Sequence, residues 1–211
     1  MRTRLATALM TLTLSTLMIG CLGKVKYPTY YTLDLPPAPD PPSQAGSRPT
    51  VTVRAFRSPD YLRQGAIVYR PSLEQVGFYN YQRWAVNPSQ FVTRAMADRL
   101  RATGKFDEVT IYDGRADVDF VVTGRLEKLD EIDYAGGVNA EVAISAQMTD
   151  LRSGKTVWAG DASQVDKVDK RTISGVVSAM SNALDGAIQK LLASLAVPAT
   201  NTEPLGDRAQ R

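Results

Sequence analysis

The side chains able to do chemistry are few in this sequence, and the two most versatile types are almost missing. There is no histidine among the 211 residues, and Cys21 is the only cysteine. Without histidine, a Ser-His-Asp triad, a Cys-His pair and the usual zinc sites cannot be built. Gly136 and Gly137 precede a strand-like run and lack the Lys-Ser/Thr of a phosphate-binding loop. Ser153 and Lys155 fall in a predicted tight turn, where neither side chain would be desolvated. We therefore predict that the protein is not an enzyme and binds no cofactor.

Carboxylates are the remaining groups with catalytic or metal-binding potential, and they occur in two clusters. The first cluster is Asp113, Asp117 and Asp119. Its spacing fits no twelve-residue calcium loop, so we interpret it as a polar turn. The second cluster is an acidic run of Glu127, Asp130, Glu131 and Asp133. A glycosidase needs two carboxyl groups placed across a cleft. We interpret the acidic run instead as the solvated end of a strand.

The surroundings of the Cys21 thiol predict lipid attachment. Arg2 and Arg4 precede an uncharged stretch that is too short for the ~20 residues of an untilted membrane span, so residues 1–20 are typical of a cleaved signal peptide. The sequence Met-Ile-Gly-Cys at 18–21 resembles a bacterial lipobox, in which the cysteine receives diacylglycerol and the chain is cut before it. The alternative is an ordinary signal peptide that ends beside a cysteine. A single unpaired thiol in an exported protein then needs another explanation.

We accordingly expect cleavage between Gly20 and Cys21, acyl chains on Cys21, and residues 21–26 as anchor and tether. Several acyl chains together give stable anchoring, whereas one chain binds only marginally. Leu22 follows the cysteine where an Asp would be typical of inner-membrane retention, so we expect the protein at the outer membrane, facing the periplasm. Removal of residues 1–20 leaves 23 basic and 22 acidic side chains. Such a balance, without a basic cluster, argues against nucleic-acid binding.

The elements that must position any site are predicted from periodicity and capping. Strand-like runs occur at residues 27–35, 50–56, 66–70, 76–86, 108–112, 118–126, 138–148 and 157–160. A turn through residues 153–154 joins the last two runs as a hairpin. Asn87 as N-cap, Pro88 at the first helical position and Gln90 in a capping box begin a helix that Gly104 ends. A second apolar stripe at helical spacing runs from Ile173 to Leu195.

These elements predict one domain over residues 27–197 and a disordered tail over 198–211. The fold class is an α/β sandwich with a mixed, largely antiparallel sheet and two amphipathic helices. Residues 36–49 hold six prolines and form an extended connection. This connection is either a flexible tether or a loop across the domain surface, and the strand-like run before it favours a loop pinned at both ends.

Aromatic and arginine side chains are concentrated in residues 61–84, which we name the aromatic segment. Tyr, Trp and Arg are the side chains that most often anchor protein interfaces. Strict alternation would place Phe78 and Trp84 on one face of the strand and Tyr79, Tyr81 and Arg83 on the other. About half of these aromatics are expected to face the core. The candidate partner or oligomer interface comprises Tyr61, Tyr69, Arg70, Tyr79, Tyr81, Arg83 and Trp84.

The order of several short motifs resembles one known family. The motifs are Tyr-Tyr-Thr-Leu at 30–33, Tyr-Asn-Tyr-Gln-Arg-Trp at 79–84 leading into Pro88, Leu-Arg-Ala-Thr-Gly-Lys-Phe at 100–106, and the Ser153-Gly154 hairpin with Trp158. Together they resemble the ABC-type transport auxiliary lipoproteins, the PqiC-like group, over nearly the whole mature domain.

The resemblance implies an outer-membrane lipoprotein that partners a mammalian-cell-entry (MCE) domain protein and an inner-membrane ABC transporter with its permease. Such systems move lipids or other apolar molecules between membranes. The resemblance also implies a sandwich akin to anticodon-binding-like or TolB N-terminal folds, and ring-shaped homo-oligomers. The alternative function is a lipoprotein scaffold that activates a cell-envelope assembly unrelated to transport.

Overall fold

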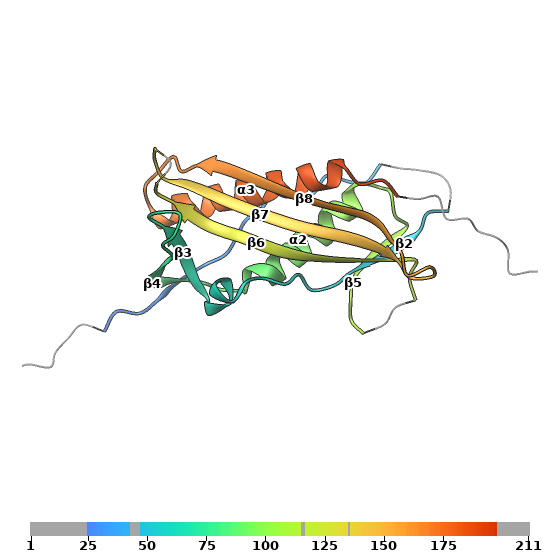
Figure 1. Cartoon of the computed structure of the whole chain (residues 1–211), viewed down its shortest axis with the longest axis horizontal. Coiled ribbons are helices and arrows are strands. Elements are labelled where there is room, and N and C mark those ends of the chain that lie inside the picture. The colour runs from blue at the N-terminus through green and yellow to red at the C-terminus, as the bar shows by residue number, and fades with distance from the viewer. Residues whose placement is uncertain (1–24, 43–46, 115–116, 135, 198–211) are drawn as a thin grey trace, which may run out of the picture.

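The computed structural model describes residues 25–42, 47–114, 117–134 and 136–197. Within these residues one sheet of eight strands is covered on one side by two helices (Figure 1). The strands are β1 (Thr29–Tyr31), β2 (Thr50–Val53), β3 (Ala66–Arg70), β4 (Gly77–Trp84), β5 (Glu108–Ile111), β6 (Phe120–Ile132), β7 (Asn139–Asp150) and β8 (Thr156–Lys167). The helices are α2 (Pro88–Ala102) and α3 (Ile173–Ala193), with a 3-10 helix η1 (Asp60–Gln64) between β2 and β3.

Strand β6 is the centre of the sheet. One of its edges pairs with β7, which pairs in turn with β8, and these long ladders are antiparallel. The other edge is shared, because β2 pairs parallel with the start of β6 and β3 pairs parallel with its end. Strand β5 extends the sheet beyond β2, and β4 and β1 extend it beyond β3. The predicted mixed sheet with two helices is confirmed, and its longest pairings are antiparallel.

The core lies between the sheet and the helices. Every second residue of β7 from Ala140 to Met148 is buried, as the alternating pattern predicts. Helix α3 packs on β7 and β8 through an apolar stripe that includes Met180, Leu184 and Ile188, all fully buried. Burial of each such side chain contributes about 1.5–3 kcal/mol. Figure 1 shows both helices on one face of the sheet, and no α-helix of the described residues covers the opposite face of β6, β7 and β8.

The ends of the helices follow their capping residues. The Asn87 side chain accepts hydrogen bonds from the backbone N–H of Ser89 (3.0 Å) and from its hydroxyl (2.9 Å), which caps α2. Gly104 has φ +65° just after α2, the left-handed conformation that ends helices. Thr172 caps α3 by accepting from the Gly175 N–H at 3.2 Å. The predicted start and end of the first helix are confirmed.

Several predicted boundaries differ from the observed ones. Strand β6 continues to Ile132 rather than ending at residue 126, and β8 continues to Lys167 rather than ending at residue 160. Strand β1 is only three residues long, Thr29–Tyr31, within the predicted run 27–35. The described part of the proline-rich connection is pinned to the domain, since the Pro36 carbonyl accepts from Arg99 at 2.7 Å and Arg48 donates to the Gly104 carbonyl at 2.9 Å. Of the two alternatives for this connection, a flexible tether and a loop across the domain surface, the described residues form the surface loop.

The acidic run is the clearest correction to the sequence-based interpretation. Glu127, Asp130 and Glu131 lie inside β6, and Asp130 and Glu131 are buried with 0% and 4% of their surface exposed. The interpretation as a solvated strand end is therefore wrong. From sequence alone, a charged residue in a strand is expected to face solvent. Only the neighbouring strands supply the hydrogen-bond and ion-pair partners that offset the free-energy cost of burying it.

Candidate functional site

The aromatic segment forms one end of the sheet, where η1, β3 and β4 meet the last residues of β6. Asp130, near the end of β6, is the most buried charged side chain at this end of the sheet. The Arg70 guanidinium donates from Nε to Asp130 Oδ2 at 2.6 Å, and the Tyr61 hydroxyl lies 3.4 Å from the same oxygen and 3.2 Å from the Glu127 carbonyl. Burial raises the pKa of Asp130 against the opposing effect of Arg70, and burial beside the Asp130 carboxylate raises the pKa of Tyr61 to about 12. This trio holds η1 and β3 onto β6.

Glu131 forms a second, separate cluster. The Tyr79 hydroxyl donates to Glu131 Oε2 at 2.9 Å, and the Tyr69 and Tyr79 rings lie 5.0 Å apart between centroids. Burial raises the pKa of Glu131, and burial together with the Glu131 carboxylate raises the pKa of Tyr79. Consecutive residues on a strand point to opposite faces of the sheet. Asp130 and Glu131 therefore cannot face each other across one cleft as a glycosidase pair would.

Strict alternation along β4 is interrupted, so the predicted assignment of its faces is wrong in part. Arg83 pairs with Ala66 and Phe78 pairs with Val68, and the register shifts between these two pairs. Directly paired residues of antiparallel strands share a face, and Ala66 and Val68 are two residues apart. Phe78 and Arg83 consequently share a pairing face although alternation predicts opposite ones. A bulge of this kind re-aims the side chains that follow it.

Only two of the seven candidate interface residues remain directed to solvent. Trp84 is buried in the core, and Tyr61, Tyr69, Arg70 and Tyr79 are occupied by the contacts described above. Arg83 donates to the Gln64 carbonyl at 3.2 Å near the surface, and Tyr81 is 38% exposed. Most side chains of the aromatic segment are thus engaged in contacts within the domain, and the predicted interface through the remaining ones stays a prediction.

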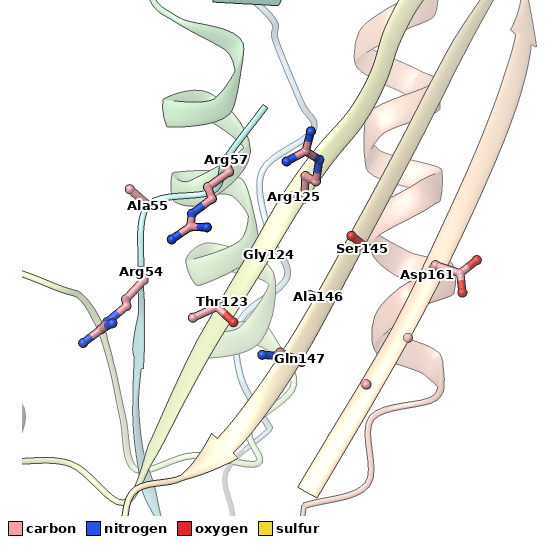
Figure 2. A pocket seen from close by; sticks show the side chains of 12 residues that line it. Arg54, Ala55, Arg57, Thr123, Gly124, Arg125, Ser145, Ala146, Gln147 and Asp161 are labelled. Carbon is pink, nitrogen blue, oxygen red and sulfur yellow. The ribbon is translucent and has the colours of Figure 1, made fainter. Parts of the chain in front are cut away.

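The uncovered face of the sheet carries a cleft that the sequence did not reveal, and we name it the arginine cleft (Figure 2). Its volume is ≈ 800 Å³. Three arginines line it: Arg54 and Arg57 follow β2, and Arg125 lies on β6 (Figure 2). Its floor consists of small or polar side chains from β6, β7 and β8: Thr123, Ser145, Gln147, Ala159 and Asp161.

The backbone holds Arg57 in place at this cleft. Its N–H donates to the Gly124 carbonyl at 3.0 Å, and its carbonyl accepts from the Leu126 N–H at 2.8 Å. Gly124 is required here, because a Cβ would lie 2.3 Å from Cε1 of Phe56, whose ring packs on the β6 backbone. The segment between β2 and η1 is therefore clamped along β6.

Charge in the arginine cleft is only partly compensated. Arg125 pairs with Glu127 at 2.8 Å, and the Arg54 guanidinium lies 4.6 Å from the centroid of the Tyr112 ring. The exposed Arg57 guanidinium has no hydrogen bond or ion pair with any residue that the structure describes. The lining carries three arginines against one carboxylate, Asp161, so its net charge is positive, which suits an anionic partner better than an apolar one. Arg125 is distant in sequence from Arg54 and Arg57, so only strand pairing could reveal the site.

Gly20 and Cys21, the predicted cleavage site and the predicted disordered tail lie outside the described residues. Among the residues that are described, neither helix is long and apolar enough to cross a bilayer.

Comparisons with known proteins identify a matching family and solved structures of similar fold. The family described as ABC-type transport auxiliary lipoprotein component matches residues 31–191. None of the curated proteins compared with the sequence matches it. Among solved structures, protein XCC0632 from Xanthomonas campestris is 14% identical with a TM-score of 0.65, covering 78% of this chain and 92% of its own. A second structure, titled an uncharacterized protein, is 15% identical with a TM-score of 0.63, covering 81% of this chain and 100% of its own.

At such low identity the two structures support the fold alone, whereas the family match spans most of the chain. This family comprises lipoproteins, which are membrane-anchored proteins of the cell envelope. The chain belongs to the family of ABC-type transport auxiliary lipoprotein components.

Proposed function

We propose that this protein is a non-catalytic lipoprotein of the outer membrane that docks the periplasmic part of an ABC-type lipid transport system. Its partner would be the MCE-domain protein of that system, which connects to the inner-membrane transporter and permease. Family membership supports a role as an auxiliary transport component, and the lipobox with Leu22 supports the location. The absence of histidine and the separation of Asp130 from Glu131 support a non-catalytic role.

The observation that carries the docking proposal is the arginine cleft on the uncovered face of the sheet. Its floor is made of small or polar side chains on paired strands, which leaves room for an extended segment of another protein to lie along it. The Arg57 guanidinium has no ion pair with any described residue, so its charge is available to attract acidic side chains and speed association. The floor has no large apolar side chain, so the cleft is poorly suited to acyl chains. We therefore assign the cleft to an acidic segment of the MCE-domain protein.

Charge reversal at the cleft tests this assignment. Arg57→Glu should reduce recovery of the co-expressed MCE-domain protein in native-detergent pull-downs by at least about tenfold, since close interfacial charge pairs couple by about 1.5 kcal/mol or more. Arg94→Glu is the matched control, because Arg94 is also exposed but lies on α2, on the helical side of the molecule. Equal recovery with both variants would remove the cleft from the docking proposal.

The wider role is tested by deletion of the gene. Deletion should raise outer-membrane permeability to bulky or apolar antibiotics, and the Cys21→Ser variant should fail to restore the barrier. If the unmodified protein recovers no MCE-domain protein or transporter subunit, and deletion leaves permeability unchanged, the transport proposal is wrong. The scaffold of an unrelated envelope assembly then becomes the better explanation.

The anchor is tested separately from the docking. Cys21→Ser should leave an unprocessed precursor that incorporates no labelled palmitate, because the acylated thiol is required before cleavage. Normal processing and membrane retention of this variant would refute lipidation at Cys21. That result would leave the Arg57 experiment interpretable, since it does not depend on the anchor.

A further inference from the structure

Exposed aromatic side chains gather at the end of the molecule where the described chain begins. Tyr27 is 79% exposed, Tyr30 is 61% exposed and Tyr81 is 38% exposed. Val25 beside them is 70% exposed, and the Lys26 ammonium lies 4.4 Å from the centroid of the Tyr81 ring. We name Tyr27, Tyr30 and Tyr81 with Lys26 the tyrosine patch. A group of exposed large apolar side chains usually marks a contact surface.

The backbone explains why these rings point outward. Strand β1 lies at the edge of the sheet and pairs only with β4, in parallel, with Tyr30 opposite Arg83 and Tyr31 opposite Trp84. Directly paired residues share a face, so Tyr31 turns toward the core with Trp84 while Tyr30 turns away from it with Arg83. Tyr30 is therefore presented by a regular strand pairing and is not simply part of a loose end.

Chain length limits how far this surface can lie from Cys21. Only three residues separate Cys21 from Val25, the first described residue. A chain spans at most about 3.6 Å per residue, so the Cα atoms of these two residues are no more than ~14 Å apart. The same limit for Tyr27 is ~22 Å. Whatever path the tether follows, an acylated Cys21 holds this end of the molecule next to the headgroups. In Figure 1 it is the end at which β3 and β4 lie.

We propose that the tyrosine patch lies in the headgroup region of the membrane that the anchor enters. This inference rests on the proposed lipidation of Cys21. A tyrosine ring suits that depth, because its apolar body can contact the acyl boundary while its hydroxyl remains hydrated. The Lys26 ammonium, beside the Tyr81 ring, faces anionic headgroups there. The patch acts as a second contact that fixes the orientation of the domain, which an acyl tether alone cannot do.

Orientation has a consequence for docking. The membrane contact lies beside β1 and β4, whereas the arginine cleft is lined by the segment after β2 and by residues of β6, β7 and β8. A domain held by both the anchor and the patch keeps the cleft directed toward the periplasm. A domain held by the tether alone would present the cleft in every direction, and its partner would have to capture one of many orientations.

Tryptophan reporters of membrane depth test the proposal. The mature lipidated protein would be reconstituted into vesicles of phosphatidylethanolamine and phosphatidylglycerol, with or without brominated acyl chains that quench nearby tryptophan. Tyr30→Trp and Tyr81→Trp each add one reporter in the patch. Tyr112→Trp adds a control matched in exposure to Tyr81, since Tyr112 is 36% exposed but follows β5. The unmodified protein supplies the background of the buried Trp84 and Trp158.

The emission added by the two patch reporters should fall at least about twofold in brominated vesicles, as for rings at the headgroup boundary, about 5–10 Å deep. The emission added by Tyr112→Trp should not change. Equal quenching of all three reporters, or of none, would overturn the proposal. If the patch is instead covered by a second copy of the chain, its reporters will resist both brominated lipid and aqueous acrylamide, which also overturns it.

The failure of this inference can be distinguished from the failure of the anchor. Flotation of the vesicles reports whether the lipidated protein is bound at all. Flotation without quenching at Tyr30 and Tyr81 means that the anchor works and the patch lies elsewhere. Loss of flotation means that lipidation itself was wrong, and the inference fails with it.

Discussion

Replacement of Arg70 by methionine should destabilise the fold strongly, because Arg70 is the only cation among the described residues that pairs with the fully buried carboxylate of Asp130. The Asp130 side chain has 0% of its surface exposed, and Arg70 has 18%. After Arg70→Met, the Tyr61 hydroxyl at 3.4 Å is the one remaining side-chain donor to Oδ2, and Oδ1 is buried without a hydrogen bond among the described residues. Loss of one partner of a buried ion pair typically costs about 3–5 kcal/mol.

The pH dependence of this cost gives a second readout. Burial already raises the pKa of Asp130 in the folded protein, and Arg70 opposes that rise. An acid whose pKa is higher in the folded than in the unfolded state takes up its proton first in the folded state, so its contribution to stability improves as the pH falls through that pKa. Without Arg70 the pKa of Asp130 rises further. The Arg70→Met variant should therefore lose less stability at pH 5 than at pH 7.5.

Urea unfolding of the mature chain at both pH values measures these differences. Arg63→Met is the matched control: Arg63 pairs with Asp60 at the surface, where the side chains are 59% and 91% exposed, and the change should cost less than about 1 kcal/mol. The double variant Arg70→Met with Asp130→Leu should recover most of the loss, since an apolar pair often replaces a buried ion pair at little cost. If Arg70→Met and Arg63→Met unfold at the same urea concentration, the reasoning about the buried carboxylate is refuted.

Three further substitutions test other contacts. Gly124→Ala places a Cβ 2.3 Å from the Phe56 ring and should lower the free energy of unfolding by about 1–3 kcal/mol, measured by urea titration; an unchanged value would show that the ring moves freely. Thr93→Val removes the acceptor for the Phe56 N–H, now at 2.9 Å, and should cost about 1–3 kcal/mol while Thr93→Ser costs less; equal losses would contradict this role. Arg99→Met breaks the 2.6 Å pair with Asp185 that joins α2 to α3, and a melting temperature within 2 °C of the parent would contradict the expected loss of about 3–5 kcal/mol.

The wild-type protein itself should be more stable at mildly acidic pH than at pH 8. Burial raises the pKa of both Asp130 and Glu131 above the ordinary values of about 3.9 and 4.3. Between those ordinary values and the raised ones, the folded state binds more protons than the unfolded state, so stability falls as the pH rises. Asp130→Asn combined with Glu131→Gln should flatten this slope. If stability still falls with rising pH in the double variant, other titratable groups cause the pH dependence.

Local patterns in the sequence were sufficient to predict the helices, the helix ends and the buried face of a strand, which depend on residues close together in the chain. The N-cap at Asn87, the stop at Gly104 and the apolar stripe of α3 each follow from residues within a few positions of one another. The alternation of β7 likewise reports which face is buried, because a strand repeats every two residues. The lipobox is also a local signal, and it remains a prediction.

Tertiary structure decided which polar side chains meet. Whether Asp130 is solvated or buried depends on β3 pairing with the end of β6, since that pairing delivers Arg70. The faces of β4 depend on a register shift against β3, which leaves no local signal. Arg57 and Arg125 share a cleft because their backbones form a bridge, although 68 positions separate them in the sequence. Sequence alone specifies the local elements, and long-range pairing specifies the charges and surfaces available for binding, because burial and electrostatics are properties of neighbours in space.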